Sequence, residues 1–538
     1  MSGIGRASAM IGAGTIVSRL TGLLRTVVLV ALIGSVKSPA SDAFALANQL
    51  PNNIYAIIST GILTAVIVPQ IVKVAAHDDG GRAFISKLFT LGTIILVATT
   101  GVAMVAAPWL VQLYAGDAAP DQIALATAFA YWCLPQVFFY GLYALVGEAL
   151  NARKIFGPFT WAPIVNNLVS IVGFVLIMVL FGSDLTAIDD WDSTSIAALG
   201  GTATLGIVVQ AVILLLFWRR TGLRLRPDFR WRGVGLRNIG RLAGWTFLMV
   251  LAGQLAGIVQ SRIVIDASGE GPSIFAMQNA WLLFMLPYSI IVLSIGTPYF
   301  TRLSEHAAAG RDADVKSDVA NSIRTLGLFI VIATAALAVA AVPASRIFTN
   351  SRSAAEEAAA VLLCFLVALI PLAVLFVVQR TFYAYNDTRT PFYFTLVQCA
   401  LVVVTAVIAS ALVDADVLPL SQLAAGVALG QSFASVVQVI IATWLLNRRL
   451  GGIGVGSWMF SLGRFALAAI PAAGAGWLTF QLLGGVEGWT VADKLLGALG
   501  AAIIGTVSLV VYAGFLALLR APELTPALGI VRRFLPKR

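Results

Sequence analysis

Charged side chains are scarce in this sequence. Asp, Glu, Lys and Arg make up 11% of its 538 residues, whereas hydrophobic residues make up 59%. Soluble domains carry about 25% charged residues, so the composition excludes an ordinary soluble globular protein. The mean hydropathy is +0.92. We therefore expect an all-α polytopic membrane protein.

Histidine and cysteine are also scarce. The two histidines, His77 and His306, fall in polar loops far apart, and Cys133, Cys364 and Cys399 lie in apolar runs. The sequence has no metal-ligand spacing, no disulfide framework, no phosphate-binding loop and no nucleophile motif. We therefore expect no metal or cofactor and no enzymatic centre. Transport without covalent chemistry is the simpler interpretation.

Apolar windows of helical length, separated by short polar loops, predict about fourteen membrane spans. The first window lacks a small-residue cleavage site and is followed by another, so we interpret it as a retained helix and not a signal peptide. The second contains Pro51 and Gly61, which predict a bent or partly unwound helix. The windows are 7–35, 42–72, 88–112, 123–150, 159–182, 197–218, 242–266, 273–300, 324–344, 357–380, 392–413, 420–446, 462–484 and 495–519.

Positive charge is distributed asymmetrically between the alternate sides of these spans. If the N-terminus is cytoplasmic, the inner loops, helix ends and termini hold 28 of the 35 Lys and Arg residues. The outer loops hold Lys37, Arg346, Arg352 and Lys494. This bias predicts that both termini are cytoplasmic and that the number of spans is even. It also attributes the net charge of +10 to membrane topology and not to nucleic-acid binding.

Two parts of the sequence recur at a common offset. The Leu-Pro pair at Pro51 recurs at Pro287, and the segment 151–159 resembles 383–392, in both cases about 230–240 residues later. Spans 1–6 and 7–12 are therefore predicted to be two bundles of the same orientation, as in transporters that bind substrate between parallel repeats. The expected divisions are an N-terminal lobe (1–240), a C-terminal lobe (241–450), and spans 13 and 14 with a cytoplasmic tail (451–538).

Arg19 and Arg25 lie in the middle of the first apolar window. An arginine at membrane depth costs about 2.5–3.5 kcal/mol on insertion scales. On a helix the two Cα atoms are separated by about 9 Å along the axis, and each side chain lies about 60° to one side of Gly22. Either they snorkel or pair with acids, or they line a wet cavity that holds an anion. Two planar guanidinium groups suit the oxygens of a phosphate or diphosphate.

Other polar residues near the spans are weaker candidates. Arg262, near the outer end of span 7, either snorkels to the surface or faces the cavity. Asp42, at the outer entry to span 2, either pairs with an arginine and gates the outer mouth or caps its helix. Gln254 and Gln260 are expected mainly to pack against neighbouring helices.

The segment 18–25 (SRLTGLLR), followed by 41–44 (SDAF) and 50–52 (LPN), resembles the N-terminal signature of the MurJ/MviN family. These are lipid II flippases of the multidrug/oligosaccharidyl-lipid/polysaccharide exporter superfamily. Residues 150–163 and 382–391 fit the same family. The resemblance implies two six-helix lobes around a central cavity and a C-terminal helix pair that lines a groove for the lipid tail. It also implies a cargo, the undecaprenyl-diphosphate-linked peptidoglycan precursor lipid II, moved from the inner to the outer leaflet of the bacterial cytoplasmic membrane.

This resemblance also assigns roles to residues. Lipid II, membrane lipids and cell-wall synthesis proteins become the expected partners, and nucleic acid is not expected. The cavity arginines of the family match Arg19 and Arg25, and its acid at the start of span 2 matches Asp42. The full set of expected site residues is Arg19, Arg25, Arg262, Ser18 and Gly22 for the substrate, Asp42 for a gate or ion pair, and Pro51, Asn52, Tyr55 and Gly61 for the cavity or a helix break.

Three departures from the family pattern leave alternatives open. Tyr55 and Leu282 stand where the family often has arginine, and Thr60 stands where it often has an acid. Fewer cavity charges fit a divergent flippase or a flippase for another lipid-linked glycan. A cation-coupled multidrug antiporter would favour acids within the spans, and a membrane scaffold would leave the embedded arginines unexplained.

Overall fold

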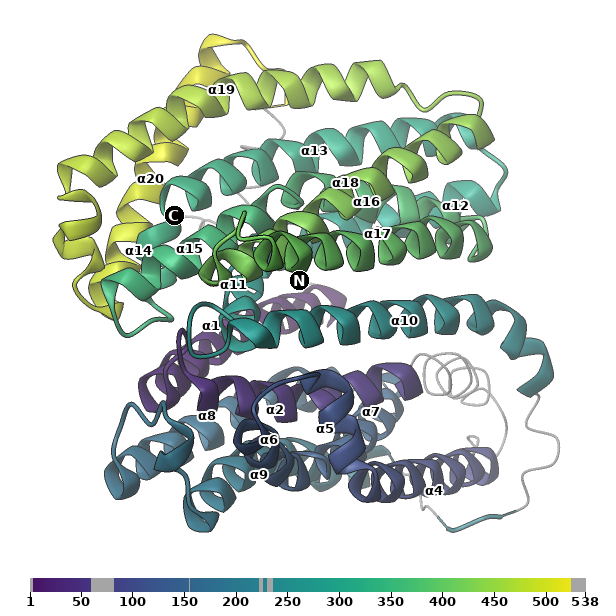
Figure 1. Cartoon of the computed structure of the whole chain (residues 1–538). Helices are drawn as coiled ribbons and strands as arrows, with labels where there is room; N and C mark the ends of the chain where they lie inside the picture. The colour runs from purple at the N-terminus through teal and green to yellow at the C-terminus, as the bar shows by residue number, and fades with distance from the viewer. Residues whose placement is uncertain (1–2, 60–81, 154, 222–225, 230–235, 524–538) are drawn as a thin grey trace. The chain divides into compact units, whose positions relative to one another are not determined.

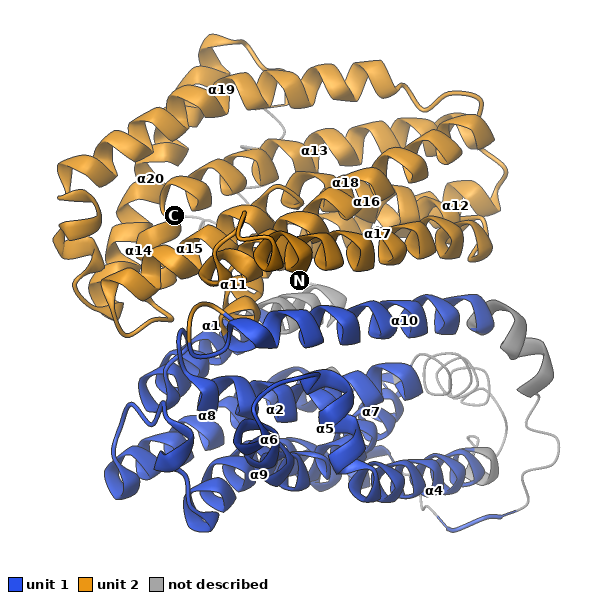
Figure 2. Ribbon diagram, viewed as in Figure 1, with its two compact units in different colours: residues 1–269, 273–275 blue, residues 270–272, 276–538 orange. Residues whose placement is uncertain are grey.

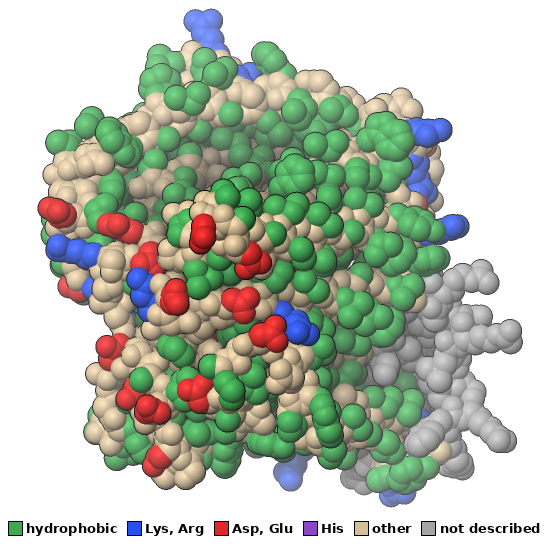
Figure 3. Space-filling view, in the orientation of Figure 1, with side chains coloured by type: hydrophobic (Ala, Val, Ile, Leu, Met, Phe, Trp, Pro, Cys, Tyr) green, Lys and Arg blue, Asp and Glu red, His purple; other side chains and the backbone are tan. Residues whose placement is uncertain are grey.

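The computed structural model has an all-helical fold, which confirms the predicted class (Figure 1). It describes the chain except for residues 1–2, 60–81, 154, 222–225, 230–235 and 524–538. Because lipid offers no hydrogen bonds to the backbone, a spanning segment must satisfy its own N–H and C=O groups, and a helix does so. Large apolar side chains accordingly lie on the outside: Val179 and Leu180 are 76% and 74% exposed. Figure 3 shows hydrophobic side chains over much of the visible face.

The described residues fall into two compact units, coloured in Figure 2. Unit 1 comprises residues 1–269 and 273–275, and unit 2 comprises residues 270–272 and 276–538. This division by packing places the helix over 236–264 with unit 1. The lobe boundaries predicted from the repeat, 1–240, 241–450 and 451–538, remain a prediction.

Nine α-helices of unit 1 lie within the described residues. They are α1 (Gly3–Ile33), α2 (Pro39–Ile58), α4 (Arg82–Val105), α5 (Ala107–Ala115), α6 (Pro120–Cys133), α7 (Gln136–Ala152), α8 (Phe156–Phe181), α9 (Ser193–Leu216) and α10 (Leu236–Val264), with 3₁₀ turns at Ile188–Asp190, Trp218–Thr221 and Ile265–Ala267.

Unit 2 follows with α11 and ends with a helix pair. Its helices are α11 (Ile274–Pro287), the π-helical η5 (Tyr288–Leu293), α12 (Ser294–Ala308), α13 (Asp312–Val339), α14 (Ala341–Arg346), α15 (Arg352–Leu366), α16 (Leu369–Ala384), α17 (Arg389–Asp414), α18 (Leu423–Arg449), α19 (Val455–Leu482) and α20 (Lys494–Leu518), with 3₁₀ turns at Leu420–Gln422, Gly485–Glu487 and Trp489–Val491.

Twelve described helical segments are long and apolar enough to cross a membrane. They correspond to the third to fourteenth predicted windows. The first window is a helix over most of its length, α1, and the second begins as α2 and extends into residues outside the described part. Helix α2 continues through Pro51 to Ile58, so the expected unwinding does not occur at that proline. Gly61 lies outside the described residues.

Helix breaks occur at matching places in the two halves, which supports the repeat. The break between α4 and α5 at Ala106 recurs between α13 and α14 at Ala340, 234 positions later. The break between α6 and α7 recurs between α15 and α16, and α7 and α16 end at Ala152 and Ala384, 232 positions apart. Since a chance resemblance of short motifs would not reproduce helix ends, the two halves share one architecture.

The last two helices pack on the rest of unit 2 through α13. A buried apolar cluster joins them, with Leu328 on α13, Phe465 on α19 and Tyr512 on α20. The Tyr512 hydroxyl donates a hydrogen bond of 3.0 Å to the backbone oxygen of Leu328, which satisfies a buried polar group. Spans 13 and 14 are thus attached to one face of the second bundle.

Candidate functional site

The two arginines of α1 lie in different surroundings. Arg19 is exposed on the surface of unit 1, together with Leu20 (61% exposed). Arg25, six residues later, is half-buried and lies within electrostatic range of Tyr140 on α7. Since six residues correspond to a rotation of about 120° between the two side chains, one face of α1 cannot carry both. A shared anion would have to be reached by two long side chains from either side of the helix.

Gly22, between the arginines, lies where α1 packs against α8. The Asn167 amide donates hydrogen bonds to the Ser18 backbone oxygen (3.1 Å) and to Thr21 Oγ1 (3.0 Å). A Cβ atom added at Gly22 would lie 3.5 Å from Asn167 Nδ2, an ordinary van der Waals separation. Ser18 and Gly22 therefore contribute to helix packing in this structure. Asn167 was missed by sequence reasoning, although an Asn-Asn pair within an apolar window was a visible signal.

Arg25 lies at the edge of a polar network inside unit 1, which we call the Tyr140 network. The Tyr140 hydroxyl donates to Gln136 Oε1 (3.4 Å), and the Gln136 amide donates to Asn48 Oδ1 (3.3 Å) and Thr204 Oγ1 (3.0 Å). These residues come from α7, α2 and α9. A polar network of this kind fixes side-chain geometry within an apolar bundle. Helix α7 supplies its centre, and the sequence analysis assigned α7 no role.

Tyr55, which stands where relatives often have arginine, borders the same network. Its ring lies 5.7 Å from the Tyr140 ring at a tilt of 33°. It also lies within electrostatic range of Glu148, a half-buried acid of α7. Pro51, one turn earlier on α2, is buried, whereas Asn52 is exposed. At this level α2 thus presents an aromatic hydroxyl to the network in place of a cation.

Asp42 is almost completely buried, with 1% of its surface exposed. Its carboxylate accepts hydrogen bonds from Ser268 Oγ (2.7 Å) and from the Phe275 backbone N–H (2.9 Å). The cap of α2 is Ser38, whose side chain accepts from the Ser41 backbone N–H, so the capping interpretation of Asp42 was wrong. In the described part of the chain no salt bridge includes Asp42. The carboxylate instead ties the first turn of α2 to the connection between α10 and α11.

Arg262 lies in the last turn of α10 and is exposed. It packs against Gly116, whose backbone is left-handed with φ +59°. A Cβ atom at that glycine would lie 3.3 Å from Arg262 Nε. The contact keeps Arg262 close to the loop between α5 and α6. The guanidinium forms no ion pair with a described residue, so both interpretations of this arginine remain open.

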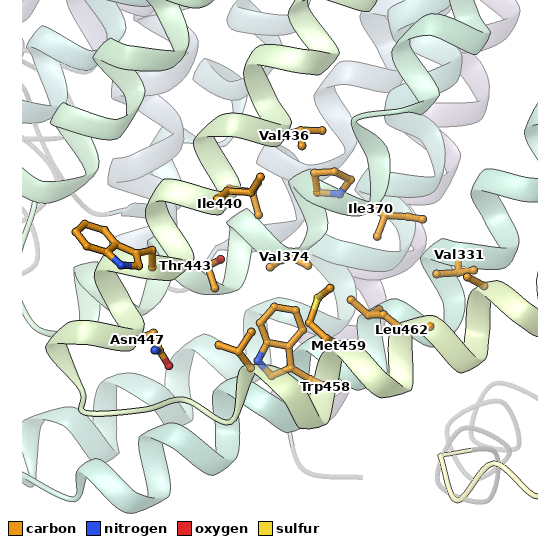
Figure 4. A pocket seen from close by; sticks show the side chains of 16 residues that line it. Val331, Ile370, Val374, Val436, Ile440, Thr443, Asn447, Trp458, Met459 and Leu462 are labelled. Atoms are coloured by element: carbon orange, nitrogen blue, oxygen red, sulfur yellow. The ribbon is translucent and has the colours of Figure 1, made fainter.

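Unit 2 contains an apolar groove with a cavity of about 720 Å³ (Figure 4). Four helices, α13, α16, α18 and α19, contribute its walls. Its polar groups are few, among them Thr443 Oγ1 and Trp458 Nε1, which are buried and have no hydrogen-bond partner among the residues that the structure describes. The lining residues are Val331, Ile370, Pro371, Val374, Val436, Val439, Ile440, Thr443, Trp444, Asn447, Val455, Trp458, Met459, Leu462, Gly463 and Ala466.

This groove suits a hydrocarbon chain. Pockets of about 300–1,000 Å³ hold ligands of moderate size, and an apolar lining selects by shape and not by hydrogen bonding. In Figure 4 the side chains of Thr443, Asn447 and Trp458 lie near one another among the lining residues. The sequence did not identify the residues of the groove, because they come from windows that look alike in composition.

The chain is similar to known proteins over most of its length. The profile described as "Lipid II flippase MurJ" matches residues 30–496. A probable lipid II flippase MurJ of Rhizobium meliloti (strain 1021) is 27% identical over 413 residues, covering 73% of each chain. One from Synechocystis sp. (strain ATCC 27184 / PCC 6803 / Kazusa) is 23% identical over 531 residues, covering 96% of this chain and 95% of the relative.

Solved structures agree on the fold. The lipid II flippase MurJ in an inward closed conformation matches with a TM-score of 0.70 and 18% identity, covering 93% of this chain and 98% of that one. A multidrug resistance MATE family transporter of the MOP superfamily, in an inward-facing conformation, matches with a TM-score of 0.66 over 82% of this chain and 96% of that one. Because the profile spans far more than half of the sequence, the chain belongs to the MurJ family of lipid II flippases.

Proposed function

We propose that this protein moves lipid II, the undecaprenyl-diphosphate-linked precursor of peptidoglycan, from the inner to the outer leaflet by alternating access. The observation that carries the proposal is the family match over residues 30–496. The chemistry of the chain fits such a cargo, because unit 1 offers cations at membrane depth and unit 2 offers an apolar groove. An amphipathic cargo needs both kinds of surface.

The diphosphate is expected to bind at α1. Arg25 is the principal contact, because it is half-buried beside the Tyr140 network, which restricts its side chain. A guanidinium retains its charge in such surroundings and binds phosphate oxygens through two parallel N–H groups. Arg19 is exposed and therefore accessible to the same headgroup. The hydrogen bonds of the network hold Tyr140, which interacts electrostatically with Arg25, in place before the cargo arrives.

The polyprenyl tail is expected to occupy the groove of unit 2. The tail never has to leave an apolar environment, so the groove guides it and does not extract it from water. A tail held against α19 would stay in an apolar environment, apart from the polar headgroup. This arrangement follows the expectation for spans 13 and 14 drawn from the family.

Asp42 is proposed to hold the outer end of unit 1 in one state of the cycle. Its hydrogen bonds reach the connection that leads from α10 into α11, which joins the two units. A carboxylate that accepts from a hydroxyl and a backbone amide can exchange these donors for others when the connection moves. The gating role proposed for Asp42 therefore acts through Ser268 and Phe275.

The protein is a multi-pass membrane protein, and we place it in the bacterial cytoplasmic membrane with both termini inside. The charge distribution over the loops supports this orientation. The cargo is carried unchanged, so the role is transport and not catalysis. Enzymes of cell-wall synthesis on the two sides would supply and consume the cargo.

Depletion of the protein tests the proposal. In a bacterial strain without a redundant flippase, loss of this protein should cause labelled lipid II to accumulate in the inner leaflet, and re-expression should restore delivery. Outward delivery that continues unchanged after depletion would refute the proposed function. Delivery of another lipid-linked glycan, with lipid II unaffected, would assign the protein to that cargo instead.

A further inference from the structure

A further half-buried arginine, Arg380, lies in unit 2. It occupies α16 one turn before the helix ends at Ala384, and it is half-buried. The sequence analysis assigned it no role. Intramembrane ionisable residues are costly and usually line a pathway or a site. Its surroundings therefore indicate what it is for.

Aromatic rings occupy positions against the guanidinium. The Arg380 Cζ atom lies 5.0 Å from the centroid of the Phe300 ring and 5.3 Å from that of the Phe376 ring. The Phe376 ring approaches α12 at Gly296, where an added Cβ atom would lie 2.4 Å from Phe376 Cε1. A glycine is thus required there. Cation–π contacts use the face of a guanidinium and leave the N–H donors at its edge available.

Two tyrosines, Tyr288 and Tyr383, lie close enough to Arg380 to interact with its charge. Tyr288 is the first residue of the π-helix η5, directly after Pro287, and π-helical turns are frequent at functional sites. The Tyr383 hydroxyl accepts a hydrogen bond of 2.8 Å from the Gln379 amide, so its own hydrogen can be donated elsewhere. The Tyr383 hydroxyl is therefore available as a hydrogen-bond donor to a ligand.

Some arginines of unit 2 have carboxylate partners. Arg302 pairs with Asp318 at 2.6 Å, and Arg449 pairs with Asp387. In the described part of the chain, Arg380 has neither a carboxylate partner nor a hydrogen bond from its guanidinium. A half-buried guanidinium that contacts two aromatic rings and has unused N–H donors is suited to bind the oxygens of a phosphate.

The repeat relates this cluster to the Tyr140 network of unit 1. When the ends of α7 and α16 are aligned, Arg380 takes the place of Glu148. In unit 1 Tyr55 lies near Glu148, and in unit 2 Tyr288 lies near Arg380. In each unit, a tyrosine that follows a proline thus lies near a charged residue on one of the two aligned helices, α7 or α16.

We propose that Arg380, Tyr288 and Tyr383 form an oxyanion site in unit 2 that binds a phosphate of the lipid-linked cargo. The proposal rests on the proposed function for the identity of the cargo. It accounts for the absence of an arginine at Leu282, because Arg380 supplies a cation to the same unit from α16. The phosphate lies against the guanidinium edge, and the two hydroxyls donate to its oxygens.

Binding to the full-length protein tests the site. The purified chain, in nanodiscs of neutral lipid, would be titrated with undecaprenyl diphosphate, with phosphatidylglycerol and with inorganic pyrophosphate. Arg380→Gln should weaken binding of undecaprenyl diphosphate about 10-fold, the effect of losing one charge-assisted hydrogen bond. Arg380→Lys keeps the charge but loses the planar fork, so its affinity for undecaprenyl diphosphate should lie between those of the wild type and Arg380→Gln.

Arg389→Gln is the matched control. Arg389 is an exposed arginine that stacks on Tyr393 at 5.6 Å, so its replacement removes the same charge from α17 without touching the cluster. It should bind undecaprenyl diphosphate as the wild type does. Thermal unfolding of each variant shows whether it is folded, and if Arg380→Gln is not, Arg380→Lys provides the measurement.

Two results would overturn the inference. One is an Arg380→Gln variant, folded, that binds undecaprenyl diphosphate with wild-type affinity. The other is an Arg380→Gln variant that loses affinity for phosphatidylglycerol but not for undecaprenyl diphosphate, which would assign the site to a membrane phospholipid. Failure of the wild type to deliver lipid II in cells would refute the proposed function separately, because the binding titration does not depend on transport.

Discussion

Replacing Arg25 with alanine is expected to weaken cargo binding strongly without destabilising the fold. Arg25 is a half-buried cation at membrane depth, and among the described residues it interacts electrostatically with a tyrosine, Tyr140, and forms no salt bridge with a carboxylate. Removing it therefore leaves no buried acid unpaired. Placing an arginine at this depth costs about 2.5–3.5 kcal/mol, so the alanine variant should unfold at the same temperature or higher.

Whereas the substitution should keep or raise the unfolding temperature, it should lower the affinity for the cargo. A hydrogen bond to a charged group contributes about 1.5–3 kcal/mol, so losing even one such contact to the diphosphate should raise Kd about 10- to 100-fold. Lipid II binding to the purified protein and lipid II delivery in cells measure this loss, and thermal unfolding and membrane insertion are measured on the same preparations. Arg25→Lys should recover part of the affinity, because it restores the charge but not the fork.

Tyr140→Phe tests whether the network positions Arg25. It removes the hydroxyl that donates to Gln136 while keeping the ring beside Tyr55. We expect a smaller loss of affinity than for Arg25→Ala, with a Tm close to that of the wild type. A folded and inserted Arg25→Ala variant with wild-type binding and delivery would refute the assignment of Arg25 to the site.

Three further changes are predicted from the packing. Gly463→Phe should reduce lipid II delivery without lowering Tm, because a Cβ atom there meets nothing within 4 Å and the ring would enter the groove. Gly474→Phe is the control, because Gly474 lies on the same helix outside the groove and is equally open. Equal delivery by both variants would contradict the role of the groove. Asp42→Ala should lower the free energy of unfolding by about 1–3 kcal/mol, because it leaves a buried hydroxyl and a backbone N–H without their acceptor. Thermal or denaturant unfolding measures this loss. Unchanged stability together with lost transport would instead favour a gating role without a structural one. Gly206→Ala should destabilise the protein by about 1–3 kcal/mol, since its Cβ atom would lie 2.2 Å from a buried Asn side chain. Gly22→Ala is the control and should unfold at the wild-type temperature, because its Cβ atom would lie 3.5 Å from its nearest neighbour. Equal Tm values for the two variants would contradict the packing at the α8–α9 interface.

The course of the helices could be predicted from the sequence because each span has to satisfy its own backbone in lipid. The third to fourteenth windows became helices long enough to cross a membrane, and the breaks at Ala106 and Ala340 fall at the offset that the repeat had indicated. Pro51 was the exception. Its missing N–H did not interrupt α2, whereas the equivalent Pro287 precedes a π-helical turn.

The sequence by itself determined the membrane class, the repeat and the presence of two costly arginines, because composition, offset and insertion cost are properties of single segments. The tertiary structure decided what surrounds them. It separated Arg19 from Arg25, gave Asp42 hydroxyl and amide donors where an arginine had been considered, and placed Tyr140 beside Arg25. It also covered Arg380 with two rings. The reason is physical: which face of an apolar helix meets which neighbour depends on packing between helices, and in lipid every face is equally apolar.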